Sequence, residues 1–163
     1  MTLIFTALVA AQVVGLVVFA GVRQSVLSQG REVVLQTVPV DPRSLLQGDY
    51  AILDYEIAAP PDYLGDLRAG ETVFVVLRES PDAWYAADYR LHEPGGGDVY
   101  IRGTVDDRGR LDFGIGTYFV PEGTGRIIER AGDVKVVVAI GERGNAVIKR
   151  VLVDEKPFDP VKQ

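Results

Sequence analysis

The stretch VDPRSLLQGDYAILDY, residues 40–55, is the most informative about the fold, because it predicts a capped helical turn followed directly by a strand with alternating apolar residues. Asp41 can cap a helix, Pro42 suits the first helical position, and Gly48 can end the turn in a left-handed conformation. The sequence therefore predicts one helical turn over residues 41–48, with a strand starting immediately afterwards.

Side chains on that predicted strand alternate between two faces. The apolar face is expected in the core and consists of Ala51, Leu53, Tyr55 and Ile57. The opposite face is mixed and consists of Tyr50, Ile52, Asp54 and Glu56. Asp49 lies at the mouth of the strand, where it is well placed either for chemistry or for an Asx turn, and the turn is favoured.

The rest of the chain after residue 30 is dominated by short runs of β-branched and aromatic residues, separated by Pro- and Gly-containing turns. The predicted strands are residues 32–38, 50–57, 72–79, 84–91, 98–105, 110–116, 133–140 and 146–153. A second short helix is predicted over residues 126–131, with Thr124 as its N-cap and Gly132 as its stop. About eight strands at this spacing predict a mainly β fold, a small barrel or sandwich with one or two short helices.

An apolar run precedes this body. Residues 3–22 carry only two polar side chains, Thr6 and Gln12, and the first charged side chain is Arg23. Twenty helical residues span roughly 30 Å, the thickness of a bilayer's hydrocarbon core. A cleaved signal peptide and a buried core helix are the alternatives. The run lacks a preceding basic region and a polar stripe, so an uncleaved transmembrane anchor is favoured.

The sequence thus divides into an anchor over residues 1–23, a linker over 24–30, a β-rich domain over 31–155 and a flexible tail over 156–163. The linker residues could also extend the helix by a turn or two before Gly30 ends it.

Composition excludes several kinds of site. The net charge of -6 argues against a nucleic-acid partner, because such proteins neutralise phosphates with lysine and arginine. The absence of cysteine and the single His92 exclude thiolate and multi-histidine metal sites. Residues 106–112, DDRGRLD, lack the order of an EF-hand calcium loop and are interpreted as a hairpin tip. No metal and no cofactor is predicted.

Two segments carry a family resemblance. Residues 48–55, GDYAILDY, fit the pattern Gly-Asp-Tyr-x-x-Leu-x-Tyr, and residues 118–129, YFVPEGTGRIIE, resemble the second signature of the same family. The chain resembles the GDYXXLXY proteins, an uncharacterised bacterial family, over the N-terminal apolar segment and most of the body.

The resemblance implies a bacterial envelope protein in the inner membrane, anchored by its N-terminus with its C-terminal domain outside the cytoplasm. It also implies a multi-pass membrane protein as partner, and it brings no reaction. Charge alone, through Arg23 and Arg31, would place the body in the cytoplasm, so the extracytoplasmic orientation follows the resemblance.

The function predicted from these features is a non-enzymatic module that contacts the bilayer through residues 3–22 and binds a partner membrane protein. No catalytic residue is assigned. The alternative is a carboxylate-based enzyme or ligand-binding domain, with a site formed by the two signature segments. The candidate functional residues are Arg43, Asp49, Tyr50, Tyr118, Glu122, Arg126 and Glu129.

Residues 41–55 are also similar to the segment that leads into a strand in type I signal peptidases. Those enzymes carry a nucleophilic serine in a Ser-Met-x-Pro setting, which this chain lacks; its nearest serine is Ser44. A serine–lysine dyad would also need one of the four lysines as general base. An active peptidase is therefore disfavoured.

Overall fold

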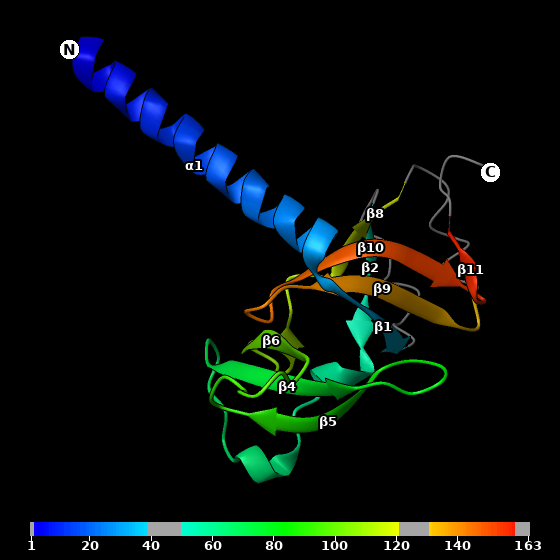
Figure 1. Ribbon diagram of the computed structural model, residues 1–163. Coiled ribbons are helices and arrows are strands. Elements are labelled where there is room, and N and C mark those ends of the chain that lie inside the picture. Colours follow the sequence, from blue (N-terminus) through cyan, green and yellow to red (C-terminus); the bar gives the residue numbers. More distant parts are fainter. Residues whose placement is uncertain (1, 39–49, 121–130, 159–163) are drawn as a thin grey trace.

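The computed structural model describes residues 2–38, 50–120 and 131–158, which form one long N-terminal helix and a β-rich body (Figure 1). Helix α1 is Thr2–Gln29. The strands are β1 Arg31–Val38, β2 Tyr50–Ile52, β3 Asp54–Tyr55, β4 Thr72–Arg78, β5 Tyr85–Arg90, β6 Tyr100–Val105, β7 Leu111–Asp112, β8 Thr117–Phe119, β9 Val134–Ile140, β10 Ala146–Val153 and β11 Lys156–Pro157. Two short 3-10 helices, η1 Glu56–Ala58 and η2 Asp62–Leu64, follow β3.

The described strands form three antiparallel sheets that together make a half-barrel. The larger sheets have the orders β11-β10-β9-β1-β3 and β5-β4-β6-β7, and β2 pairs with β8 in a two-stranded ribbon. The prediction of a mainly β fold is confirmed. The closed barrel is not formed: among the described strands, β11 and β3 end one of the larger sheets, and β5 and β7 end the other.

Backbone hydrogen bonds join the sheets. Trp84 N–H donates to the Val34 carbonyl (2.8 Å), so the chain entering β5 touches β1. Arg102 N–H on β6 donates to the Gly144 carbonyl in the β9–β10 turn (2.8 Å). The core lies between the two larger sheets, and it is built from alternating inward-facing residues that include Val33, Leu35, Val73, Val75, Ile101, Val136 and Val138. Alternation along each strand is what buries one face of a sheet.

The predicted strand over residues 50–57 is divided in the structure. Its first part, β2, pairs with β8, whereas β3 pairs with β1. Leu53 lies between the two and donates its N–H to the Gly116 carbonyl (2.9 Å), so the chain changes sheets at this residue. The predicted faces nevertheless hold: Ala51, Leu53, Tyr55 and Ile57 are all buried. Alternation predicted the buried side chains, and it could not predict which strand each part would pair with.

Other boundaries differ from the predictions at identifiable residues. The predicted strand 110–116 stops after Asp112, whose carboxylate accepts the Gly114 N–H (2.8 Å) while Gly114 adopts a φ of 71°. The chain then forms β8, which was not predicted. Residues 156–158, assigned to the flexible tail, instead join the sheet: β11 pairs with β10 and Phe158 is buried. The predicted helical turn 41–48 and most of the predicted helix 126–131 lie outside the described residues.

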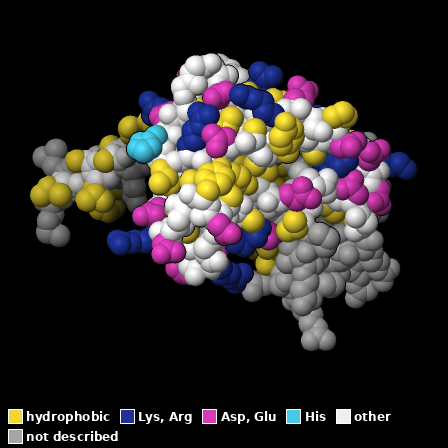
Figure 2. Space-filling model, turned by 90° about the horizontal axis from the view of Figure 1, so that it is seen from below, with side chains coloured by type: hydrophobic (Ala, Val, Ile, Leu, Met, Phe, Trp, Pro, Cys, Tyr) yellow, Lys and Arg dark blue, Asp and Glu magenta, His cyan; other side chains and the backbone are white. Residues whose placement is uncertain are grey.

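Helix α1 projects away from the body along most of its length (Figure 1). It is long and apolar enough to cross a membrane, and none of its apolar window is buried inside the structure. Figure 2 shows these apolar side chains standing clear of the body, whose visible face mixes acidic and basic groups. The alternative that this segment is a buried core helix is therefore wrong. Length and composition alone do not distinguish an anchor from a signal sequence.

The last turns of α1 are packed onto the body, so the predicted linker 24–30 is helical almost to its end. Val26 is buried, and the Gly30 N–H donates to its carbonyl (2.8 Å). A Cβ at Gly30 would lie 2.4 Å from the Val26 carbonyl oxygen and 3.0 Å from that of Ile140. Gly30 ends the helix as predicted, but lack of space, and not a left-handed conformation, is what requires glycine there.

Candidate functional site

The two signature segments meet in the β2–β8 ribbon. Tyr50 is paired with Phe119, Ala51 with Tyr118 and Ile52 with Thr117. Tyr50 is the first residue of β2 and Phe119 is the last residue of β8, so the chain enters and leaves the ribbon at the same end. The structure therefore brings together two stretches of sequence that are far apart in the chain, which sequence reasoning could only raise as a possibility.

The outer face of this ribbon carries an aromatic pair. The Tyr50 and Phe119 rings lie 4.2 Å apart between centroids with their planes tilted by 55°. Both are accessible, since Tyr50 is 39% and Phe119 65% exposed. Phe119 was not among the candidate residues, although it directly follows Tyr118 in the second segment. Tyr118 is on the other face of β8, half-buried against the core, so it is less available to a ligand than its neighbour.

Leu53 and Tyr55, in contrast, belong to the core. The Tyr55 hydroxyl donates to the Ile115 carbonyl (2.8 Å) in the segment that leads into β8. The Tyr55 ring meets Phe113 edge-on, with centroids 6.4 Å apart. Burial raises the pKa of the Tyr55 hydroxyl well above its usual range, so it stays protonated and keeps donating. Tyr55 therefore ties β3 to the start of β8 and is a structural residue.

The remaining candidates Arg43, Asp49, Glu122, Arg126 and Glu129 lie outside the described residues. The structure describes the β2–β8 ribbon next to two of these candidates in the chain. Asp49 directly precedes β2, and Glu122 comes three residues after the end of β8.

A family model described as GDYXXLXY protein matches residues 12–151. The chain belongs to the GDYXXLXY family. No curated protein and no solved structure matches it. The match covers the second half of the apolar segment and nearly all of the body.

In this GDYXXLXY protein the signature has two separate roles. Its leucine and second tyrosine, Leu53 and Tyr55, hold the ribbon to the core. Its first tyrosine, Tyr50, faces outward beside Phe119. The alternating strand period predicts this division, because residues 50 and 55 are an odd number of positions apart.

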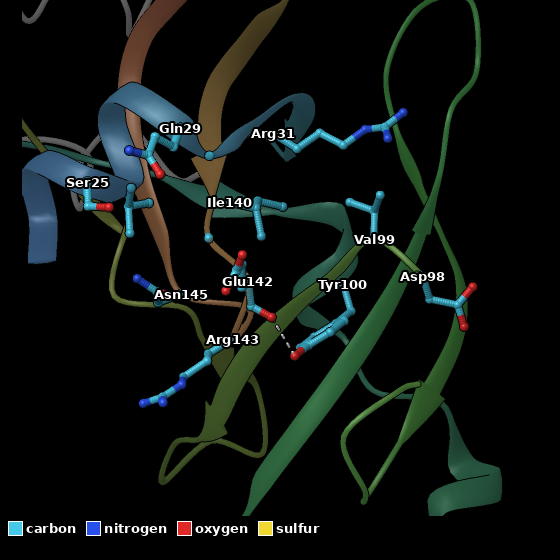
Figure 3. Close-up of a pocket in the computed structure, with 13 residues that line it drawn as sticks. Ser25, Gln29, Arg31, Asp98, Val99, Tyr100, Ile140, Glu142, Arg143 and Asn145 are labelled. Carbon is cyan, nitrogen blue, oxygen red and sulfur yellow. Dashed lines mark hydrogen bonds between the residues drawn. The ribbon is translucent and has the colours of Figure 1, made fainter. Parts of the chain in front are cut away.

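A second feature of the GDYXXLXY protein is a cavity of about 640 Å³ at the foot of α1. Its lining comes from the end of α1, the start of β1, the residues entering β6 and the β9–β10 turn (Figure 3). The apolar part of the lining is Val26, Val99, Ile140 and the ring of Tyr100, and polar side chains surround it. Sequence analysis missed this cavity because no single segment contributes more than a few of its residues.

Tyr100 closes one side of the cavity with its hydroxyl. The hydroxyl lies against the Glu93 carboxylate and 2.9 Å from the Glu142 backbone carbonyl (Figure 3). Burial and then the Glu93 carboxylate raise the pKa of Tyr100 to about 12, so the group is a neutral donor at physiological pH. It therefore connects the loop before β6 to the β9–β10 turn.

Two of the four lysines occupy positions unsuited to a general base. The Asp133 carboxylate accepts a hydrogen bond from Lys135 and raises the pKa of its ammonium group, and the two lie 3.2 Å apart. Lys149 is paired with Glu32 at 2.7 Å. A base must lose its proton near neutral pH, so the raised pKa of Lys135 works against that role for this lysine.

The hairpin tip predicted over residues 106–112 is confirmed. The Asp106 carboxylate accepts the N–H groups of Arg108 and Arg110 (2.8 Å each), and these bonds hold the pKa of Asp106 below its usual range. Within residues 2–38, 50–120 and 131–158, no group of three His, Cys, Asp or Glu side chains is arranged to hold a metal ion.

Proposed function

We propose that this GDYXXLXY protein is an anchored module of the bacterial inner membrane, with its β-rich domain on the extracytoplasmic side. Its role is to bind another integral membrane protein through the face that carries Tyr50 and Phe119. It performs this role by contact and not by catalysis.

Helix α1 supports the anchor. Its apolar side chains are not covered by the rest of the protein, as with Ile4, Phe5 and Leu16, which are 74%, 71% and 66% exposed. Exposed apolar area costs about 25 cal/mol per Å², so a helix of this kind is stable only when a bilayer or a partner covers it. The packed foot of α1, with Val26 buried, also makes the helix part of the folded domain, which argues against its removal by cleavage.

The observation that carries the binding role is the exposed Tyr50–Phe119 pair. Large aromatic side chains are enriched in protein interfaces and in their energetic centres, and they contribute much contact area at low entropic cost. Here the two segments that carry the family resemblance pair with each other and expose two such rings side by side. A purely structural role for the pair would favour burying them.

The test is affinity capture of the full-length chain from detergent-solubilised membranes of its native host, with the recovered proteins identified by mass spectrometry. The variant is the double substitution Y50S/F119S. The matched control is Y85S/L91S, because Tyr85 and Leu91 are 53% and 47% exposed and lie in or beside β5, away from the ribbon.

We expect one integral membrane protein to be enriched by the unchanged chain and by Y85S/L91S. Y50S/F119S should reduce its recovery at least about tenfold, as for the loss of an aromatic centre of binding worth 2 kcal/mol or more. Equal recovery with all three chains would remove the Tyr50–Phe119 face from the proposal, and recovery of no membrane protein by the unchanged chain would overturn the binding role.

Location is tested separately. Alkaline carbonate extraction should leave the chain in the membrane fraction, and protease added to spheroplasts should degrade the β-rich domain without lysis. Release by carbonate would overturn the anchor, and protection until lysis would reverse the orientation.

The alternative is a carboxylate-based site, and one observation favours keeping it: β2 begins directly after Asp49 in the chain, β8 ends three residues before Glu122, and these two strand ends pair. Two carboxylates in different environments can divide acid and base roles. Thermal unfolding of the full chain against a library of envelope metabolites would reveal a ligand, and D49N/E122Q should abolish its stabilisation. A stabilising ligand that the double variant still binds would remove this site from consideration.

A further inference from the structure

The cavity at the foot of α1 lies at a depth set by the helix itself. The apolar run ends at Val22, and Ser25, Val26 and Gln29 on the following turns line the cavity. At 1.5 Å per residue these three lie about 4 to 10 Å beyond the run. The polar headgroup layer is about 5 to 8 Å deep on each side of a bilayer. If α1 spans the membrane, the cavity therefore begins within the headgroup layer and reaches its outer boundary.

The lining suits a molecule with an apolar part and several polar groups. Val26, Val99 and Ile140 offer apolar contact in its lining. Ser25, Gln29 and Asn145 place uncharged donors and acceptors around them, from α1 on one side and from the β9–β10 turn on the other (Figure 3). A pocket with apolar walls and a few convergent polar groups is the usual form of a small-molecule site.

Charges of both signs are available at the rim. Arg31 and Arg143 form no ion pair with the described residues, and Figure 3 shows Arg31 at the start of β1 and Arg143 in the β9–β10 turn, with their side chains extending in opposite directions. The Glu142 carboxylate also has no ion pair within the described part of the chain and lies between the two arginines in Figure 3. Asp98 differs, because Arg78 (2.8 Å) and Arg90 (3.6 Å) neutralise it.

The end of α1 adds further negative character. The last carbonyl groups of a helix carry a partial negative charge equivalent to roughly half an elementary charge, which favours a nearby cation. Because Ser25, Val26 and Gln29 of α1 line it, the cavity combines guanidinium groups for an anion with a carboxylate and the negative end of the helix for an ammonium group.

We propose that this cavity binds the headgroup of a zwitterionic phospholipid carrying a primary ammonium group, as in phosphatidylethanolamine. Arg143 or Arg31 binds the phosphate, and Glu142 with the carbonyls at the end of α1 accepts the ammonium N–H groups. The bound lipid sets the height of the β-rich domain over the bilayer. The inference rests on the proposed membrane anchor, which places the cavity among headgroups.

Trp84 is a built-in probe of the site. It is the sole tryptophan, and the guanidinium carbon of Arg31 lies 5.4 Å from the centroid of its ring. Because Arg31 also lines the cavity, a ligand that moves Arg31 changes the surroundings of the indole. The experiment is a titration of Trp84 fluorescence in the full-length chain in detergent micelles. The probes are short-chain phosphatidylethanolamine, phosphatidylcholine, phosphatidylglycerol, free phosphoethanolamine and inorganic phosphate.

Two double substitutions supply the comparison. E142Q/R143Q removes one acidic and one basic side chain from the β9–β10 turn and leaves the net charge unchanged. D107N/R108Q makes the same change at the β6–β7 tip, where both side chains are also exposed and neither lines the cavity. Circular dichroism of each variant confirms that it is folded before titration.

We expect saturable binding of phosphatidylethanolamine, weaker by at least about tenfold for phosphatidylglycerol and phosphatidylcholine, which lack the ammonium N–H groups. E142Q/R143Q should weaken binding by about tenfold or more, and D107N/R108Q should leave it unchanged. Equal binding of all three lipids, or equal effects of the two variants, would overturn the proposal.

The free headgroup compounds identify the source of the ligand. Phosphoethanolamine or phosphate binding as tightly as the lipid would show a soluble ligand and overturn the lipid assignment. Alkaline carbonate extraction separates the two proposals. If carbonate releases the chain but the chain still binds the lipid, only the proposed anchor is overturned. If the chain stays in the membrane but binds no lipid, only the lipid site is overturned.

Discussion

The foot of α1 and the β2–β8 ribbon are built in opposite ways. At the foot, Val26 is buried and the backbone approaches so closely that Gly30 and Gly141 have no room for a Cβ without displacing a neighbour. On the ribbon, two strands of three residues each present Tyr50 and Phe119 to the outside. The first region is close-packed where α1 meets the sheet, beside the cavity, and the second leaves its largest side chains accessible.

This difference separates stability from recognition. Substitutions at the foot should cost folding free energy, because a close-packed backbone cannot yield to an added atom. Substitutions on the outer face of the ribbon should leave folding almost unchanged and affect only what binds there. Each of the following substitutions tests one part of that contrast.

The largest effect is expected for Gly30→Ala. The added methyl group would lie 2.4 Å from the Val26 carbonyl oxygen on the last turn of α1 and 3.0 Å from the Ile140 carbonyl oxygen on β9, so the junction between α1 and β1 must distort. We expect a loss of at least about 2 kcal/mol in the free energy of unfolding, measured by thermal or denaturant unfolding in detergent. The matched control is Gly21→Ala on the same helix, where a Cβ meets nothing within 4 Å. Equal stability of the two variants would show that the foot is not close-packed.

A smaller effect is expected within the signature itself. Tyr55→Phe removes the hydroxyl that donates to the Ile115 carbonyl and leaves that buried acceptor unpaired, at a cost of about 1 to 2 kcal/mol. Tyr50→Phe removes the same atom from an exposed ring and should change stability by less than about 0.5 kcal/mol. Denaturant unfolding of both variants measures the difference, and similar losses for the two would contradict the division of the signature into a core part and a surface part.

The smallest effect concerns the tip of the β6–β7 hairpin, which borders the ribbon side of the body. Backbone N–H groups of Arg110 and Arg108 lower the pKa of Asp106 in the folded state, so its contribution to stability is full above its unfolded pKa and is lost as pH falls through the folded pKa. Asp106→Asn should therefore reduce the free energy of unfolding at neutral pH by about 0.5 kcal/mol or less, given solvent screening. The variant should also lose less stability than the unchanged chain as the pH falls below about 4. Unfolding curves from pH 2.5 to 7 test this, and an unchanged slope in acid would contradict it.

Sequence patterns predicted the elements better than their partners. Apolar alternation identified the buried set Ala51, Leu53, Tyr55 and Ile57, because the side-chain period of a strand is independent of its neighbours. The same pattern could not show that residues 50–52 and 54–55 pair with different strands, since pairing depends on segments far along the chain. Tail residues Lys156 and Pro157 were misassigned for the same reason: their polar, Pro-containing sequence gave no sign of the β10 edge they join.

The candidate site shows the same limit. Motif resemblance selected Tyr50 and Tyr118, and the register of the ribbon, which no local pattern encodes, showed that Phe119 and not Tyr118 is the ring beside Tyr50. The cavity at the foot of α1 had no local signal, because its residues come from three separate parts of the chain.

By itself, the sequence determined the apolar helix, the mainly β body and the family to which the chain belongs, since these depend on composition, period and motif. Only the tertiary structure decided that the two signature segments form one ribbon, that its outer face exposes an aromatic pair, and that the helix ends in a packed joint with a cavity beside it. The physical reason is that local patterns specify which side chains are buried, whereas long-range strand pairing specifies which parts of the protein they pack against.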